Sequence, residues 1–255
     1  MNKLIAANWK MNKTAKESIE FIGDFKKLLK KEKTKNVEII ICPSFTSLQA
    51  VSQEIKKTVI KLGAQNMHFE EAGAYTGEIS AAMLKESCEY VILGHSERRE
   101  IFKEDDFSVN KKMIAALHNS LKPILCVGEN FEQRENGKAK EIIKKQIMDC
   151  LSSVNKSQVP KVTIAYEPIW AISKGDPNKK SATANDAEEM HKFIRKVIAT
   201  LYDKFVAKKM RIIYGGSMKP ENAKQLLEMP NIDGGLVGNA SLNAKSFFDI
   251  IKYTD

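Results

Sequence analysis

Eight short apolar runs alternate with longer amphipathic segments along the whole chain, and this alternation limits the folds that are open to it. Most of the runs are continuously apolar, which is typical of strands buried on both faces of a parallel sheet. The 255 residues divided by eight give about 32 residues for each strand–helix unit. The runs cover residues 4–8, 37–42, 59–65, 90–94, 123–128, 162–167, 211–216 and 232–238.

The segments between the runs carry apolar residues at the i, i+3, i+4 spacing of an amphipathic helix. Even alternation of strands and helices predicts a parallel sheet with right-handed crossovers, and eight units predict a closed (β/α)8 TIM barrel. An open doubly wound sheet is the alternative, although no GxGxxG turn follows the first run. We expect one domain over residues 1–255. The helical segments are 17–32, 108–120, 138–154, 185–205 and 221–229.

The cysteine spacing, the apolar runs and the net charge limit the cellular locations and the partners that are expected. The four cysteines are far apart and form no CxxC pair, so neither a disulfide framework nor a metal site is expected. The apolar run Leu4–Ala7 is too short for a signal peptide, and no stretch is long enough to span a membrane, so we expect a cytoplasmic protein. The net charge of +9 indicates either lysine-rich coding or an anionic partner. Nucleic acid is not expected, because the lysines are spread along the chain without a recognition motif.

Glu167 ends a predicted strand, in a position where the carboxyl ends of barrel strands would form a mouth. Pro168 holds Glu167 in an extended conformation. The apolar neighbours Ile169 and Trp170 would withdraw the carboxylate from water and raise its basicity, which suits a general base. The alternative is a rim carboxylate that is paired with a nearby cation.

His95 follows a strand and a glycine in the same way. Ser96 is expected to cap a helical turn with Glu97 in its first turn, and the positive end of that turn would keep His95 neutral. A neutral imidazole donates a hydrogen bond from one ring nitrogen. The alternative is a core histidine that is satisfied by a backbone carbonyl. The remaining histidines, His68, His118 and His191, are expected to be surface or packing residues.

Further candidates lie after the first strand and after the last two. Asn8 and Lys10 flank a tryptophan at the end of the first strand, where a lysine can stabilise a developing oxyanion. The glycine-containing turns in 214–223 and 235–242 can bind an anion through backbone N–H groups, and in barrels of this kind such turns form a phosphate site. A solvated lysine and ordinary tight turns are the alternatives.

Seven motifs occur in one order along the chain: NWKMN (8–12), AYTGEIS (74–80), GHSERR (94–99), CVGE (126–129), AYEPIWAI (165–172), YGGS (214–217) and GLVGNASL (235–242). Through them the chain resembles the triosephosphate isomerase family over essentially its whole length. The resemblance implies interconversion of dihydroxyacetone phosphate and D-glyceraldehyde 3-phosphate, a step of glycolysis and gluconeogenesis. It also implies that no metal or organic cofactor is needed.

The resemblance implies a role for each matching residue. Glu167 would move the proton between the two carbons, and Lys10 would stabilise negative charge. His95 would polarise the carbonyl and shuttle protons on the enediolate oxygens. Asn8 would order the site and Glu97 would lie beside the lysine. Backbone donors would hold the phosphate, and these belong to Ser173, Ser217, Gly238 and Asn239.

Two further segments matter in this resemblance. The segment 65–80 is similar to the loop through which family members form a homodimer, with Thr76 approaching Asn8 and Lys10 of the other subunit. The segment 171–182 is similar to the family lid but is four residues longer. Ser173 and Asn239 stand where the family commonly has glycine, so we expect intact acid–base chemistry with a modified lid closure.

Two other functions remain open from the residues alone. A different phosphosugar barrel enzyme, such as an epimerase or aldolase, is the first; an aldolase needs a Schiff-base lysine late in the barrel, and no lysine ends a predicted strand. A barrel protein whose basic surface binds an anion, alone or beside catalysis, is the second. The presence of Lys10, His95 and Glu167 favours the isomerase.

Overall fold

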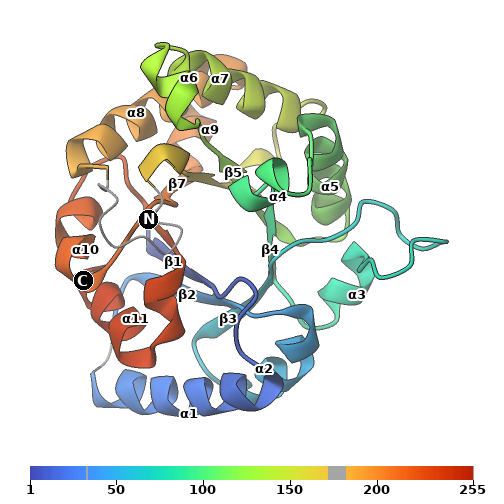
Figure 1. Ribbon diagram of the computed structural model, residues 1–255, viewed down its shortest axis with the longest axis vertical. Coiled ribbons are helices and arrows are strands. Elements are labelled where there is room, and N and C mark those ends of the chain that lie inside the picture. Colours follow the sequence, from blue (N-terminus) through green and yellow to red (C-terminus); the bar gives the residue numbers. More distant parts are fainter. Residues whose placement is uncertain (33, 172–181, 255) are drawn as a thin grey trace.

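The computed structural model describes residues 1–32, 34–171 and 182–254. In it, eight parallel strands close into a barrel in chain order, because the first strand pairs with both the second and the last. Figure 1 looks along this barrel and shows the strands at the centre with the helices around them. The strands are β1 (Lys3–Asn8), β2 (Val37–Cys42), β3 (Ile60–Ala64), β4 (Tyr90–Leu93), β5 (Lys122–Val127), β6 (Thr163–Tyr166), β7 (Arg211–Tyr214) and β8 (Gly234–Val237).

Every predicted apolar run therefore contains a strand, and the closed barrel confirms the predicted fold class. The continuous apolar character has the expected cause. Within β1, Leu4 and Ala6 pack inside the barrel, whereas Ile5 and Ala7 pack outward against the helices. β1 thus has two buried faces, which explains why its sequence is apolar without alternation.

The helices form an outer ring whose longest members begin at side-chain caps. Thr14 and Glu17 make a capping box before α1, and Thr183 and Asp186 make another before α8. The helices are α1 (Ala15–Lys31), α2 (Leu48–Glu54), α3 (Ala81–Lys85), α4 (Ser96–Glu100), α5 (Asp106–His118), α6 (Phe131–Glu135), α7 (Ala139–Cys150), α8 (Ala184–Leu201), α9 (Lys204–Lys209), α10 (Pro220–Leu227) and α11 (Ala244–Ile251), with short 3-10 turns that include η3 (Ile169–Ala171) and η4 (Asn239–Leu242).

Two predicted helices are wrong in their extent. The helix predicted over 138–154 ends at Cys150, and the one predicted over 185–205 is divided in two. The chain leaves the helical conformation after Leu201 and starts α9 at Lys204. Asp203 causes the break, because its backbone is extended and its carboxylate accepts the N–H of Val206 at 2.7 Å. Aspartate is a strong N-cap residue, so a second helix begins where the apolar spacing alone predicts continuation.

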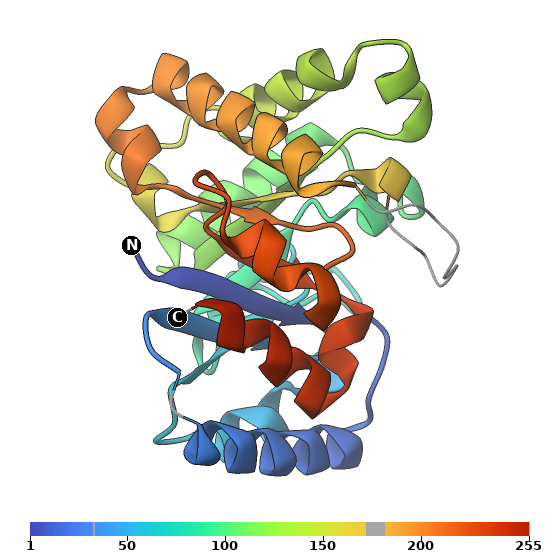
Figure 2. The same ribbon diagram turned by 90° about the vertical axis from the view of Figure 1, so that its left-hand side faces the viewer.

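The two ends of the barrel differ in what they hold. Figure 2 shows the N-terminus at one end of the barrel and η3, which follows β6, at the other. We call these ends the base and the mouth. Asn8 ends β1, and His95 and Glu167 each follow the end of a strand, so the fold brings them to the mouth. Within the described residues, no helix has both the length and the apolar character that crossing a membrane requires.

Candidate active site

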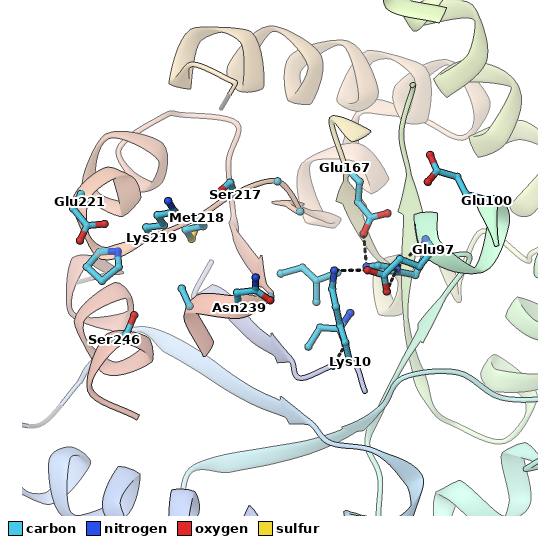
Figure 3. A pocket seen from close by; sticks show the side chains of 18 of the residues that line it. Lys10, Glu97, Glu100, Glu167, Ser217, Met218, Lys219, Glu221, Asn239 and Ser246 are labelled. Carbon is cyan, nitrogen blue, oxygen red and sulfur yellow. Dashed lines mark hydrogen bonds and ion pairs between the residues drawn. The ribbon is translucent and has the colours of Figure 1, made fainter. Parts of the chain in front are cut away.

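A cavity of about 830 Å³ opens at the mouth of the barrel. In Figure 3, Lys10, Glu97 and Glu167 lie close together on one side of it, and Ser217 and Asn239 lie across from them. The predicted site residues that line this cavity are Asn8, Lys10, His95, Glu97, Glu167, Ser217, Gly238 and Asn239. Residues from five different strand ends thus meet in one place.

Glu167 is a buried carboxylate with one bonded oxygen and one open oxygen. Its side chain is 2% exposed. The Oε2 atom accepts the N–H of Ser96 at 2.8 Å. The Oε1 atom lies 3.1 Å from His95 Nε2, and within the described residues it accepts no hydrogen bond. A carboxylate oxygen that lines a cavity and accepts no hydrogen bond is available to take a proton.

Glycines give this carboxylate its space. A Cβ atom on Gly215 would lie 2.8 Å from Glu167 Cγ, and a Cβ on Gly128 would lie 1.9 Å from the backbone oxygen of Glu167. Both distances are too short for any side chain. The glycines of the CVGE and YGGS motifs are therefore required where β5 and β7 pass the end of β6.

His95 is itself the N-cap of α4, which corrects the prediction that Ser96 caps this turn. Its Nδ1 atom accepts the N–H of Glu97 at 3.2 Å, whereas the N–H of Ser96 is already bonded to Glu167. The Nδ1 atom consequently carries no proton, and a neutral ring has its N–H at Nε2. That nitrogen lies 3.1 Å from Glu167 Oε1, but the orientation of the two groups does not form a hydrogen bond.

Lys10, on the same side of the cavity, is held in an unusual backbone conformation. Its φ angle of 53° lies in the left-handed region, which residues other than glycine rarely occupy. Asn8 Oδ1 accepts its backbone N–H at 3.1 Å, and Gln65 Nε2 donates to its carbonyl at 2.9 Å. Its ammonium lies 2.6 Å from Glu97 Oε1. The strained backbone thus directs the Lys10 ammonium toward the mouth.

The turns after β7 and β8 present unbonded backbone donors. Within the described residues, neither the N–H of Ser217 nor that of Asn239 is bonded to a protein acceptor. A Cβ on Gly216 would lie 2.3 Å from the Tyr214 hydroxyl, so this turn also requires glycine. Two unpaired N–H groups beside one cavity suit an anionic group.

Two predicted site residues lie outside this cavity. Thr76 is exposed and belongs to the segment before α3, which projects away from the barrel in Figure 1. Ser173 and most of the predicted lid lie outside the described residues. Within the described part of the chain, His, Cys, Asp and Glu side chains do not gather in groups of three that could hold a metal ion.

A cluster beside the mouth was not predicted as part of the site. Glu129 is fully buried, and its Oε1 atom accepts the Tyr166 hydroxyl at 3.0 Å and the Trp170 indole N–H at 2.9 Å. Arg134 lies 3.3 Å from the same oxygen and stacks 4.2 Å from the Trp170 ring. Burial raises the pKa of Glu129 despite these donors. The acid of the CVGE motif, directly after a strand, was the available signal.

Comparisons with known proteins cover nearly the full length of the chain. The family model described as triosephosphate isomerase matches residues 3–254. A protein named triosephosphate isomerase from Dictyoglomus turgidum is 51% identical over 251 residues, and one from Finegoldia magna is 50% identical over 252 residues; each alignment covers 98% of both chains. The chain belongs to the triosephosphate isomerase family.

Membership in the triosephosphate isomerase family agrees with the geometry of the mouth. The family name describes an isomerase of a phosphorylated triose, and such a reaction needs a proton acceptor, a carbonyl-polarising group and a phosphate site. Glu167, His95 with Lys10, and the turns at Ser217 and Asn239 have the chemistry of these three parts.

Proposed function

We propose that the chain interconverts dihydroxyacetone phosphate and D-glyceraldehyde 3-phosphate at the mouth cavity, with Glu167 as the base. The observation that carries this proposal is the open Oε1 atom of Glu167, buried and 3.1 Å from His95 Nε2. No other group that lines the cavity combines burial with an unused acceptor of this kind within the described residues.

The proton transfer follows from the positions of the three side chains. Glu167 Oε1 takes a proton from the carbon beside the carbonyl, and the electrons of that C–H bond form an enediolate. The Nε2–H of His95 donates to the oxygen that gains charge, and Lys10 stabilises the same charge. His95 Nε2 gives its proton to that oxygen and takes the hydroxyl proton from the neighbouring oxygen, which becomes the new carbonyl. Return of the proton from Glu167 to the other carbon then completes the isomerisation. This division of roles between a glutamate and a neutral histidine is already known for the family.

The phosphate group of the substrate is proposed to bind across the cavity from Glu167. The unpaired N–H groups of Ser217 and Asn239 support this assignment, and Gly238 lies between β8 and η4 beside them. Asn239 supplies only a backbone donor, so its replacement of a common family glycine leaves that interaction available. Ser173, which lies outside the described residues, is assigned to the phosphate by the family resemblance alone.

The hinge of the proposed lid is the cluster of Glu129, Arg134, Tyr166 and Trp170. We infer that the Trp170 indole fixes the start of the segment 171–182 through its bond to Glu129. The lid would exclude water from the enediolate, as is known for this family. The segment is four residues longer than the family lid, and we assign no role to the additional residues.

The assembly and location are proposed on the family resemblance. A homodimer through loop 65–80 would place Thr76 near Asn8 and Lys10 of the partner, and the exposure of Thr76 in the single chain agrees with this. We propose that residues 1–255 form one domain, that the protein acts in the cytoplasm, and that catalysis uses no cofactor. Pairing of β1 with β8 supports the single domain.

The test is an isomerase assay on purified protein in both directions. Glu167→Gln is expected to lower kcat by about a thousandfold or more, because it removes the proton acceptor and keeps the shape. The matched control is Glu221→Gln, which changes an exposed acid lining the same cavity and is expected to leave kcat within about twofold. Near-normal turnover by Glu167→Gln would end the assignment.

A further inference from the structure

A second cavity, of about 530 Å³, lies at the base of the barrel. We call it the basal cavity. It lies beside the start of β1 and the start of β8. In Figure 2 this end of the barrel is opposite the end that holds η3. Basic side chains dominate its lining: Lys3, Lys192, Arg195, Lys196, Lys204 and Lys208.

Four of these cations have no partner among the described residues. Lys192 and Lys196 project from α8, and Lys204 and Lys208 project from α9. All four are exposed, and within the described residues their side chains make no hydrogen bond or ion pair. Each pair is spaced i, i+4, so two like charges lie side by side on each helix and destabilise it. Since α8 and α9 pack against each other, the four charges also face one cavity.

The acids near the cavity are already engaged elsewhere. Asp233 pairs with Arg195 at 2.7 Å and accepts the N–H of Ile212. Glu188 accepts both donors of Asn231. Asp233 is neutralised by Arg195, and Glu188 keeps its charge because its donors are neutral. One carboxylate offsets only part of the charge of four lysines, so an outside anion would relieve the remaining repulsion.

The polar floor of the basal cavity is built of fixed groups. Arg195 donates to the carbonyls of Ala207, Met210 and Asn231 as well as to Asp233, which ties α8, α9 and the start of β8 together. Lys3 donates to the carbonyl of Ile232. Together these hydrogen bonds hold the floor of the basal cavity in place beneath the four lysine side chains.

The chemistry of the lining identifies the class of ligand. Lysine ammonium groups bind phosphate oxygens as point charges without a required orientation. The volume is that of a small-molecule site. No aromatic side chain lines the cavity within the described residues, so nothing there would stack a nucleobase. The cations converge on one concavity, whereas a nucleic acid needs an extended stripe.

We propose that the basal cavity binds a compact anion with two or more phosphate groups, such as an inorganic polyphosphate or a sugar bisphosphate. This site is separate from the mouth, where a triose phosphate carries one phosphate group. Binding stabilises the folded protein by mass action, because the four lysines converge only in the folded state.

The experiment titrates the full-length protein with inorganic tripolyphosphate by calorimetry, in the presence of saturating triose phosphate to fill the mouth. One site per chain is expected. The variant Lys192→Gln/Lys196→Gln/Lys204→Gln/Lys208→Gln is expected to bind at least about tenfold more weakly, which is about 1.4 kcal/mol. The corresponding four Lys→Arg changes keep the charge and are expected to keep binding.

The matched control removes the same charge from other exposed helical positions, Lys16, Lys30, Lys31 and Lys144, and is expected to bind within about twofold of the wild type. An equal loss in this control would overturn the proposal in favour of general surface charge. Displacement of tripolyphosphate by triose phosphate would place binding at the mouth and overturn it as well. Tighter binding of a single-stranded oligonucleotide than of tripolyphosphate at equal salt would identify a nucleic acid surface instead.

The basal variant also separates this proposal from the proposed isomerase activity. Because the four lysines lie at the far end of the barrel, kcat/KM is expected to stay within about twofold of the wild type. Its Tm without ligand is expected to equal or exceed that of the wild type, since repulsion is removed. In the presence of tripolyphosphate only the wild type and the arginine variant are expected to gain Tm. A gain of equal size in the glutamine variant would contradict the assignment.

Discussion

Two carboxylates, one at each end of the barrel, lie in very different surroundings. At the base, Glu38 accepts the Tyr90 hydroxyl on one oxygen and the Arg211 guanidinium on the other, both at 2.5 Å. At the mouth, Glu167 has one oxygen bonded to Ser96 and one without a hydrogen bond within the described residues. The fully bonded carboxylate supports the fold, and the partly bonded one is placed to react.

The pKa of Glu38 shows what complete bonding does. Burial alone would raise this pKa, but the hydrogen bonds from Tyr90 and Arg211 and the charge of Arg211 outweigh burial and lower it. Glu38 is therefore committed to its ionised form and to its partners. Glu38 in that state stabilises the fold at the base of the barrel, and it does not line the mouth cavity where a substrate proton would be taken.

An open oxygen alone does not identify a base. Glu129 Oε2 is also buried without a hydrogen bond within the described residues. Glu129, however, does not line the mouth cavity, and its other oxygen takes donors from Tyr166 and Trp170. A carboxylate that acts as the catalytic base must therefore have both an unused acceptor oxygen and access to the substrate.

After Glu167→Gln, Lys10→Met is expected to have the largest effect among the variants that probe the two ends. Loss of a cation aimed at a developing oxyanion costs about a hundredfold to a thousandfold in kcat. Steady-state kinetics with either triose phosphate measures it. Lys16→Met, which removes an exposed charge from α1, is the control and is expected to leave kcat unchanged. A fall of less than about tenfold in Lys10→Met would remove this residue from the reacting groups.

Glu38→Gln is expected to do the opposite, with lost stability and intact catalysis. It leaves the Arg211 charge, which is largely buried, without its counter-ion, which costs about 3 kcal/mol in the free energy of unfolding. Urea denaturation measures the loss, and kcat is expected to stay within about twofold. A large fall in kcat in a folded variant would show that the base and the mouth are coupled.

Trp170→Phe is expected to have a moderate effect, confined to the mouth. It removes the indole donor from Glu129 and keeps an aromatic ring for Arg134 to stack on. One hydrogen bond to a charged acceptor is worth about 1.5 kcal/mol, so kcat/KM is expected to fall by about tenfold or less. Unchanged kinetics would mean that this bond does not fix the hinge.

The pH dependence of stability gives the smallest effect and the clearest sign. The pKa of Glu38 is lowered on folding, so the wild type exceeds Glu38→Gln in stability above the ordinary pKa of 4.5, and the difference shrinks as pH falls. The pKa of Glu129 is raised by burial, so the wild type loses stability relative to Glu129→Gln as pH rises through 4.5 and above. Urea titrations from pH 3 to pH 7 measure both slopes. If the stability difference between wild type and variant changed with pH in the same direction for Glu38→Gln and Glu129→Gln, the proposed difference between the two carboxylates would be contradicted.

The sequence predicted the barrel and the residues at its mouth for a physical reason. Continuous apolar runs reveal strands buried on both faces, and polar residues at their ends, such as Glu167 and Asn8, must then converge. The break before α9 was missed, because apolar spacing continues across Asp203 and only its cap reveals the stop. The role of His95 as the N-cap of α4 was missed for a similar reason, because His95 and Ser96 are neighbours and the side chain of either can accept a backbone N–H.

The remaining features depend on contacts between distant segments. Glu129 meets Trp170 across 41 positions of the chain, and no local pattern records that meeting. The lysines of the basal cavity lie on two helices and look like ordinary solvated residues until α8 and α9 pack together. Convergence of like charges is a property of the folded chain, so the even distribution of lysine along the sequence concealed it.

Solvent deuterium exchange into dihydroxyacetone phosphate, followed by NMR, tests most directly whether the open oxygen of Glu167 is the base. This exchange requires removal of the carbon-bound proton, so loss of the base is expected to abolish it even where the other groups are intact. The account predicts that Glu38→Gln exchanges at the wild-type rate and that Glu167→Gln loses the exchange by about a thousandfold or more. Exchange by Glu167→Gln near the wild-type rate would contradict it.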